Sequence, residues 1–227
     1  MDIRLFFAVL VFCIGTATAQ TNKAWPVKAG EVPRDVLPKE AIYVLPVFTN
    51  GTVFFRNGAA VQQRFNYNFL LNEMHFLGEK GDTLAIADPS LIKSVVIDTL
   101  VFYYDKGFLQ EFFRAGDYKL AFKQAMVQVA DKTRGAYDAA SGTSAIKTYG
   151  TIYNSGSLYQ LQVKKDVLFQ GVTSLYIGNA YHSFLKASKK NFHLLFGEKN
   201  ISIFIQEHKT NFNNAEDLKA LLLYCVQ

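Results

Sequence analysis

Serine and lysine recur three times at the spacing Ser-x-x-Lys. On a helix, this spacing lets the lysine amine take the serine proton and so creates a nucleophile. None of the three pairs stands at a clear helix start, no Lys-Thr-Gly triplet follows, and no Gly-x-Ser-x-Gly motif occurs. The pairs are therefore interpreted as coincidental: Ser90 with Lys93, Ser144 with Lys147, and Ser183 with Lys186.

Histidine is the next residue type that could carry chemistry. No two of the four histidines have the spacing of a helical metal site. Glu73 lies two residues from His75, so both side chains fall on the same face of a predicted strand. An exposed polar pair is the favoured interpretation there, and no metal ligand is predicted. The other histidines are His182, His193 and His208, the last of which is expected to be a hydrogen-bonded residue at the edge of a helix stripe.

Paired carboxylates, as in glycoside hydrolysis, need no local motif because the two acids can lie far apart in the chain. Aspartate is also favoured in turns for backbone reasons. The sequence therefore predicts no catalytic residue, and the absence of a glycine-rich phosphate loop predicts no nucleotide cofactor. The acids that fall near predicted turns are Asp82, Asp88, Asp98, Asp105 and Glu111.

Composition predicts a folded, modestly basic protein. Half of the residues are hydrophobic and 15% are aromatic, so the chain can bury a core. The formal net charge is +5, and the lysines are spread along the chain, which favours solvated faces over an anionic lipid or glycan surface. Outside the leader the only cysteine is Cys225, expected to be buried and inert.

The first nineteen residues predict a signal peptide. Arg4 precedes an apolar run over residues 5–14, and Ala17 and Ala19 form the small-x-small pattern that a signal peptidase cuts. The run is too short to span a bilayer. We therefore expect cleavage between Ala19 and Gln20, a periplasmic or extracellular protein, and no transmembrane helix in the mature chain.

Four of the five prolines fall between Pro26 and Pro46, which predicts an extended arm over residues 20–46. Alternating and β-branched segments then predict many short strands, with Asn57-Gly58 as a hairpin turn and a bulge near Gln124. A glycine-rich surface loop is expected over residues 131–156. The predicted strands are residues 52–56, 63–69, 71–77, 82–87, 94–98, 100–105, 108–113, 118–129, 158–163, 167–169 and 174–177.

Three short amphipathic helices are predicted over residues 188–226. Ser188 can cap the first and Gly197 can end it, while the spacing from Asn213 to Glu216 is that of a capping box for the third. Short helices with apolar stripes must cover a sheet. We predict an α+β fold, in which an antiparallel sheet, roll or sandwich is covered by three C-terminal helices in a single domain over residues 47–227.

Several segments resemble a family of small secreted proteins of unknown function from Bacteroidota-type Gram-negative bacteria. The similar positions are residues 51–55, 65–68, 81–84, 189–192, 195–196, 201, 205, 211–212 and 216–222. This resemblance implies a fold and a location but no activity. The leading hypothesis is a non-enzymatic binding protein whose partner is a protein or a cell-envelope glycan or lipid and not a nucleic acid. The alternative is a small secreted hydrolase or acyltransferase with an acid-pair or Ser/Lys site.

Overall fold

The computed structural model describes residues 23–129, 147–148, 162–197 and 201–227. The predicted signal peptide and the candidate Ser144 lie outside these residues, as do most of the predicted loop over 131–156 and most of the predicted strand over 158–163.

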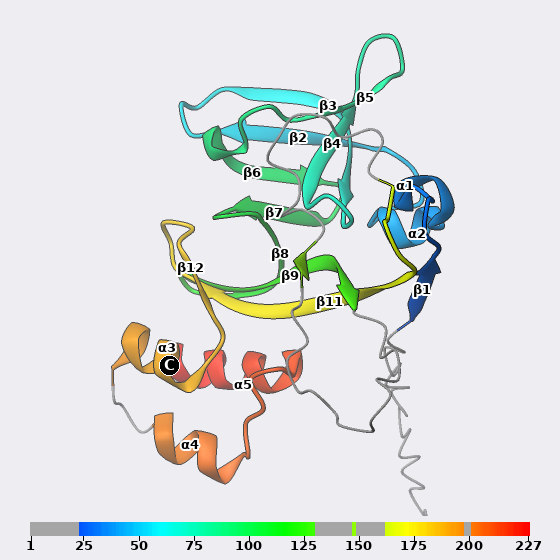
Figure 1. Cartoon of the computed structure of the whole chain (residues 1–227). Coiled ribbons are helices and arrows are strands. Elements are labelled where there is room, and N and C mark those ends of the chain that lie inside the picture. Colours follow the sequence, from blue (N-terminus) through cyan, green and yellow to red (C-terminus); the bar gives the residue numbers. More distant parts are fainter. Residues whose placement is uncertain (1–22, 130–146, 149–161, 198–200) are drawn as a thin grey trace, which may run out of the picture.

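Twelve strands of the described residues form one antiparallel sheet (Figure 1). Its order is β1-β11-β9-β8-β7-β6-β2-β3-β4-β5, with β10 beside β9 and β12 beside β11. Three helices lie along β11 on one side of this sheet, which confirms the predicted α+β class. The strands are β1 (Ala24–Val27), β2 (Thr49–Phe55), β3 (Ala60–Asn68), β4 (Glu73–Leu77), β5 (Thr83–Ala85), β6 (Ile92–Ile97), β7 (Leu100–Tyr104), β8 (Phe108–Ala115), β9 (Tyr118–Val129), β10 (Lys147–Thr148), β11 (Val167–Gly178) and β12 (Phe184–Lys186).

The predicted bulge near Gln124 is wrong. β9 pairs with β11 in continuous register through Gln124, which faces Thr173. The irregularity lies instead in β8, between Glu111 and Phe113, where the pairing with β9 shifts by one residue. The hydrophobic parity changes along β9 without a bulge because residues of both faces are buried: Leu120 and Met126 lie on one face, and Ala121 and Val127 lie on the other.

The segment predicted to be an extended arm contains β1 and two short helices, α1 (Pro33–Val36) and α2 (Lys39–Ile42). Pro33 occupies the start of α1, where its missing N–H and fixed φ suit a helix. Four apolar residues between the prolines are buried against the sheet. They are Val27, Leu37, Ala41 and Ile42, which pack with Leu70, Met126 and Phe169.

The segment before β2 also covers a polar residue of β3, Asn66, which is buried. The side-chain amide of Asn66 forms hydrogen bonds with the backbone of this segment. Its Oδ1 accepts the Leu45 N–H at 3.0 Å, and its Nδ2 donates to the carbonyls of Leu45 and Val47 at 2.8 and 3.4 Å. A buried amide must be paired, so Asn66 fixes this chain against β3.

The three C-terminal helices are α3 (Lys189–Phe196), α4 (Ile201–Glu207) and α5 (Ala215–Val226). The Ser188 hydroxyl accepts the Asn191 N–H as predicted, and Gly197 ends α3 at a φ of 76°. The cap of α5 is Asn214, whose side chain accepts from Glu216 and Asp217, and not the predicted capping box from Asn213. The stripes of the helices are buried against β9 and β11 in one cluster built on Leu120, Leu175, Ile177, Phe192, Ile201, Leu218, Leu221 and Leu222.

Candidate functional site

The sheet register separates the core from a second, more polar face. Directly paired residues of antiparallel strands lie on the same face. Thr52 pairs with Val96, and Ser94 pairs with Tyr103, whereas the intervening Val53 and Val95 belong to the buried core. We call the surface opposite this core the polar face. Register places on it Gln62, Arg64, Asn50, Thr52, Phe54, Ser94, Val96, Tyr103, Leu109, Glu111, Arg114, Lys119 and Ala121.

An open hollow of about 610 Å³ lies on the polar face where β2, β3 and β6 run side by side. Its lining offers amide and hydroxyl groups, one guanidinium and one carboxylate. A Cβ at Gly51 would meet the Val96 carbonyl oxygen at 2.5 Å, so only glycine allows this close pairing of β2 with β6. The lining residues are Asn50, Gly51, Thr52, Gln62, Gln63, Arg64, Val96 and Asp98.

An exposed aromatic ring adjoins the hollow. Phe54 lies two residues from Thr52 on β2, pairs with Ser94, and keeps 39% of its surface exposed. A large apolar side chain left bare on a polar surface is more informative than one in the core. Phe54 therefore offers a flat stacking surface between the hollow and the polar network described next.

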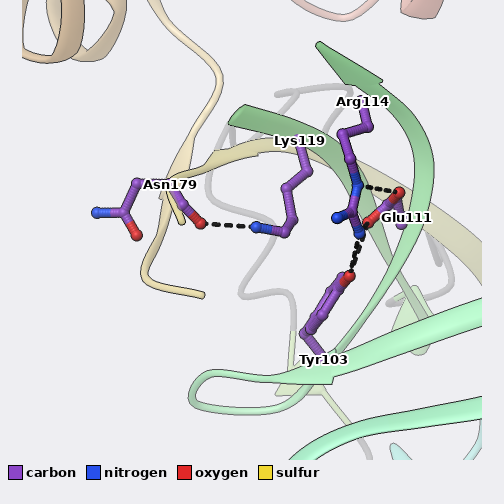
Figure 2. A network of polar contacts seen from close by, with 5 residues as sticks. All are labelled: Tyr103, Glu111, Arg114, Lys119 and Asn179. Carbon is purple, nitrogen blue, oxygen red and sulfur yellow. Dashed lines mark hydrogen bonds and ion pairs between the residues drawn. The ribbon is translucent and has the colours of Figure 1, made fainter. Parts of the chain in front are cut away.

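Tyr103, Glu111 and Arg114 form a hydrogen-bonded network on the neighbouring strands (Figure 2). The Tyr103 hydroxyl donates to Glu111 Oε2 at 2.8 Å, and Arg114 donates from Nε and Nη2 to the two Glu111 oxygens at 3.0 and 2.7 Å. Arg114 Nη2 also donates to the Tyr103 oxygen at 2.6 Å. Burial, followed by the hydrogen bond with Glu111, raises the pKa of Tyr103 to about 12.

The β8 bulge makes this network possible. Residues three apart in a regular strand point to opposite faces of the sheet. The extra residue between Glu111 and Phe113 returns Arg114 to the face that carries Glu111. The bidentate ion pair of Glu111 and Arg114 is therefore a product of the bulge.

Lys119 is buried beside this network, with 3% of its surface exposed. Its Nζ donates to the Asn179 carbonyl at 2.8 Å, as Figure 2 shows, and lies 5.5 Å from the centre of the Tyr103 ring. Burial, followed by the charge of Arg114, lowers the pKa of the Lys119 amine. The bond ties the loop that joins β11 to β12 onto the polar face.

His182 in that loop lies on the Tyr103 ring. The two rings stack at a centroid distance of 4.6 Å and an interplanar angle of 21°, and His182 adopts a φ of 60°. Its Nδ1 is buried and has no hydrogen-bond partner among the described residues. Burial lowers the pKa of His182 to about 4, assisted by four cations. In order of effect, they are Lys119, Lys93, Arg114 and Arg56.

Positive charge around His182 is only partly neutralised. Arg114 is paired with Glu111, but among the described residues the Arg56 side chain donates only to the carbonyls of Ser90 and Tyr104, at 3.0 and 3.3 Å. Lys93 is exposed and makes no hydrogen bond or ion pair within the described residues. This part of the polar face therefore carries excess positive charge.

The Ser-x-x-Lys pairs do not come together as catalytic dyads in the part of the chain that the structure describes. Ser90 bonds to Asp88 at the start of the 3₁₀ helix η1 (Pro89–Leu91), while Lys93 lies in β6. Ser183 precedes β12, and its N–H bonds to the Asn179 side chain, whereas Lys186 is exposed at the end of that strand. Neither serine hydroxyl bonds to its lysine among these residues.

The candidate acids are mostly occupied by structural contacts. Asp88 caps η1, Asp105 accepts the Phe184 N–H at 2.8 Å, and Glu111 pairs with Arg114. Asp82 lies in the turn between β4 and β5, where its carbonyl accepts the Gly78 N–H. Asp98 alone of the five lines the hollow. The hollow therefore lacks a second carboxylate among its described lining residues.

Of the pair expected to be exposed, His75 is buried and Glu73 is half-buried. His75 has 7% of its surface exposed, and its Nε2 lies 3.1 Å from Glu73 Oε2. Its Nδ1 lies 3.0 Å from the Tyr43 hydroxyl, because the segment before β2 folds over this strand. No cluster of three or more possible metal ligands occurs among the described residues. The chain Tyr43–His75–Glu73 fastens the N-terminal segment to the sheet.

Two remaining predicted residues lie among the helices. His208 is exposed, with its Nδ1 3.0 Å from the Phe204 carbonyl oxygen. Cys225 is half-buried in the helix cluster, and burial raises the pKa of its thiol to about 11. A contact between Ser202 Oγ and His193 Nε2, at 3.2 Å, was not predicted from the sequence. No described carboxylate orients that imidazole, and nine residues separate the two in the chain, so no motif reveals the pair.

Comparison with protein-family models, with curated proteins and with solved structures finds no match to this chain. None of the helices in the described ranges is long and apolar enough to cross a membrane.

Proposed function

We propose that the protein is a non-enzymatic secreted or periplasmic binding protein that binds a saccharide on the polar face. The observation that carries this proposal is the open hollow, whose lining is rich in amide and hydroxyl groups. Such groups, with one guanidinium and one carboxylate, match the donors and acceptors of a sugar. Phe54 adds an aromatic surface on which the apolar side of a sugar ring can stack.

The alternative hypothesis of a hydrolase or acyltransferase has less support. A retaining or inverting glycosidase needs two carboxyl groups across the scissile bond. Asp98 has no acidic partner in the described lining of the hollow, and the described serines of the Ser-x-x-Lys pairs contact other groups. A lining built for hydrogen bonding without an acid pair favours binding over turnover.

The proposed location follows from the predicted signal peptide and from the resemblance to small secreted proteins of Bacteroidota-type bacteria. We propose that the chain is exported and cut between Ala19 and Gln20. N-terminal sequencing of the exported protein should begin at Gln20. A retained leader, or a lipid on Cys13, would contradict this location.

The binding proposal is tested with a glycan array, followed by calorimetric titration of the saccharides that bind. Replacing two lining residues together, Thr52→Val and Gln62→Ala, should weaken binding at least about tenfold because hydrogen-bonding groups left unpaired on binding are costly. Thr173→Val is the matched control, since Thr173 is exposed on β11 and pairs with Gln124 on the opposite face. The melting temperatures of all variants are measured in parallel.

Three outcomes would overturn the proposal: binding to no saccharide, equal binding by the double variant, or steady release of products from a bound saccharide. The last would establish an enzyme instead.

A further inference from the structure

We infer that the saccharide is acidic, and that its carboxylate or sulfate group binds to a basic cluster of Arg56, Lys93 and Arg114 at the His182 loop. This inference rests on the proposed function, because it names the class of saccharide bound by the same polar face. It adds a charged subsite beside the uncharged part of the hollow.

The first support is the imbalance of charge. Four cations act on His182. Among the described residues, one of these cations, Arg114, forms an ion pair with a carboxylate, that of Glu111. Arg56 meets backbone carbonyls instead of an acid, and Lys93 is exposed without a partner among the described residues. Four cations that act on one residue and share a single paired carboxylate leave net positive charge, and such charge attracts an anion.

The second support is the geometry of Arg114. A guanidinium has five N–H donors. The bonds to Glu111 and Tyr103 come from Nε and Nη2, so Nη1 remains available in the described contacts. The Arg114 side chain is 50% exposed, and Glu111 and Tyr103 hold its plane in place. A preorganised guanidinium is well suited to a carboxylate or a sulfate.

The third support is position. Glu111 and Arg114 lie on the same face as the hollow, and β7 alone separates their strand from β6. Adjacent strands are about 4.8 Å apart. Phe54 and Ser94 lie between the hollow and Tyr103, as the pairing of β2 with β6 and of β6 with β7 requires. One chain of sugar units can therefore contact the hollow, the aromatic ring and the basic cluster together.

Lys119 has a different role in this subsite. It is buried and already bonded to the Asn179 carbonyl, so it contributes charge without direct contact. His182 remains neutral at pH 7 because its pKa is about 4, and its ring covers Tyr103. The groups left to meet the ligand are the exposed cations, Arg56, Lys93 and Arg114.

The test compares two probes that differ only in the charged group: oligogalacturonate and the same oligosaccharide after reduction of its carboxyl groups. Titration of the full mature chain at low salt should show at least about fivefold tighter binding of the acidic form, with the difference shrinking at 0.5 M salt because salt screens exposed charges. Lys93→Gln should remove most of that preference, and Lys93→Arg should retain it.

Lys190→Gln is the matched control. Lys190 is an exposed lysine on α3, which packs on the helix cluster, and its loss removes the same charge elsewhere. It should leave the preference for the acidic probe unchanged. If Lys93→Gln and Lys190→Gln reduced the preference for the acidic probe equally, the total charge of the protein would explain that preference. This result would overturn the basic subsite.

The outcomes separate the two proposals. Binding of both probes with equal affinity, lost in the Thr52→Val and Gln62→Ala double variant, would refute the acidic subsite and keep the saccharide site. Binding of neither probe, together with binding to phosphatidylglycerol vesicles that Lys93→Gln abolishes, would refute the acidic saccharide and identify a lipid surface instead. Acidic binding that the double variant leaves intact would refute the link between the cluster and the hollow.

Discussion

The two faces of β8, β9 and β11 have different compositions, although successive residues of each strand point to one face and then to the other. One face carries Leu120, Leu175 and Ile177, which are buried beneath the three helices. The other carries Lys119 and Ala121 on β9 and the Glu111–Arg114 pair on β8. Neighbouring positions of a strand thus provide the stability of the fold and the polar surface proposed to bind ligand.

The difference between the faces lies in how each is covered. Three helices close the apolar face with a large hydrophobic cluster. In the described part of the chain, the polar face is covered only in part, by the loop between β11 and β12, through the bond of Lys119 and the stacking of His182. Changes beneath the helices should therefore alter folding, whereas changes on the polar face should alter binding with smaller effects on stability.

The largest effect is expected from removing the cover of the apolar face. Deleting residues 198–227 removes α4 and α5 and exposes the surface built on Leu120 and Ile177. The remaining chain should be insoluble or molten, because exposed apolar sheet surface drives association. Solubility, near-UV circular dichroism and thermal unfolding measure this. A soluble product that unfolds cooperatively at the full-length temperature would show that the helices are a separate module.

A single substitution in the same layer should have a smaller but clear effect. Leu221→Ala should lower the free energy of unfolding by about 2–5 kcal/mol, because the side chain is fully buried and its loss leaves a cavity. Leu223→Ala is the control. Leu223 lies on the same helix with 45% of its surface exposed, so this substitution should change the free energy of unfolding by no more than about 0.5 kcal/mol. Urea titration measures both, and equal costs would mean that α5 does not pack as described.

The junction of the loop with the polar face should respond next. A Cβ at Gly178 would lie 2.5 Å from the Phe184 ring, which is buried against Tyr103 and Ala121. Gly178→Ala should therefore cost about 1–3 kcal/mol through overpacking. Gly171→Ala, in the same strand but with open space around the new Cβ, should be nearly neutral. Thermal melts compare the two, and a neutral Gly178→Ala would place the loop further from the sheet.

The smallest effect concerns pH. The pKa of His182 is about 4 in the folded protein, below the ordinary value of 6.5, so the unfolded chain binds more protons between these values. The contribution of neutral His182 to the free energy of unfolding is fully present above pH 6.5 and is lost as the pH falls toward 4. His182→Gln should reduce the fall in melting temperature over that range. An identical pH profile in both proteins would show that His182 is not held neutral by its surroundings.

Local features of the fold can be predicted from the sequence because they depend on neighbouring residues. The Asn57-Gly58 turn joins β2 to β3 with Gly58 at a φ of 90°, as predicted. The limits of β9 and the Ser188 cap also agree with prediction. Burial of Asn66 and His75 was not foreseeable, because the segment that covers them is distant in the chain.

The succession of strands, the three helical stripes and the α+β class can be predicted from the amino-acid order, because hydrophobic alternation and capping residues act over a few positions. The candidate site, in contrast, depends on contacts between segments that are distant in the chain. The bond between Lys119 and Asn179 joins residues 60 apart, and the Glu111–Arg114 pair needs a bulge that the local pattern does not encode. The hollow likewise exists because pairing brings β2, β3 and β6 together, and strand pairing is a property of the whole chain.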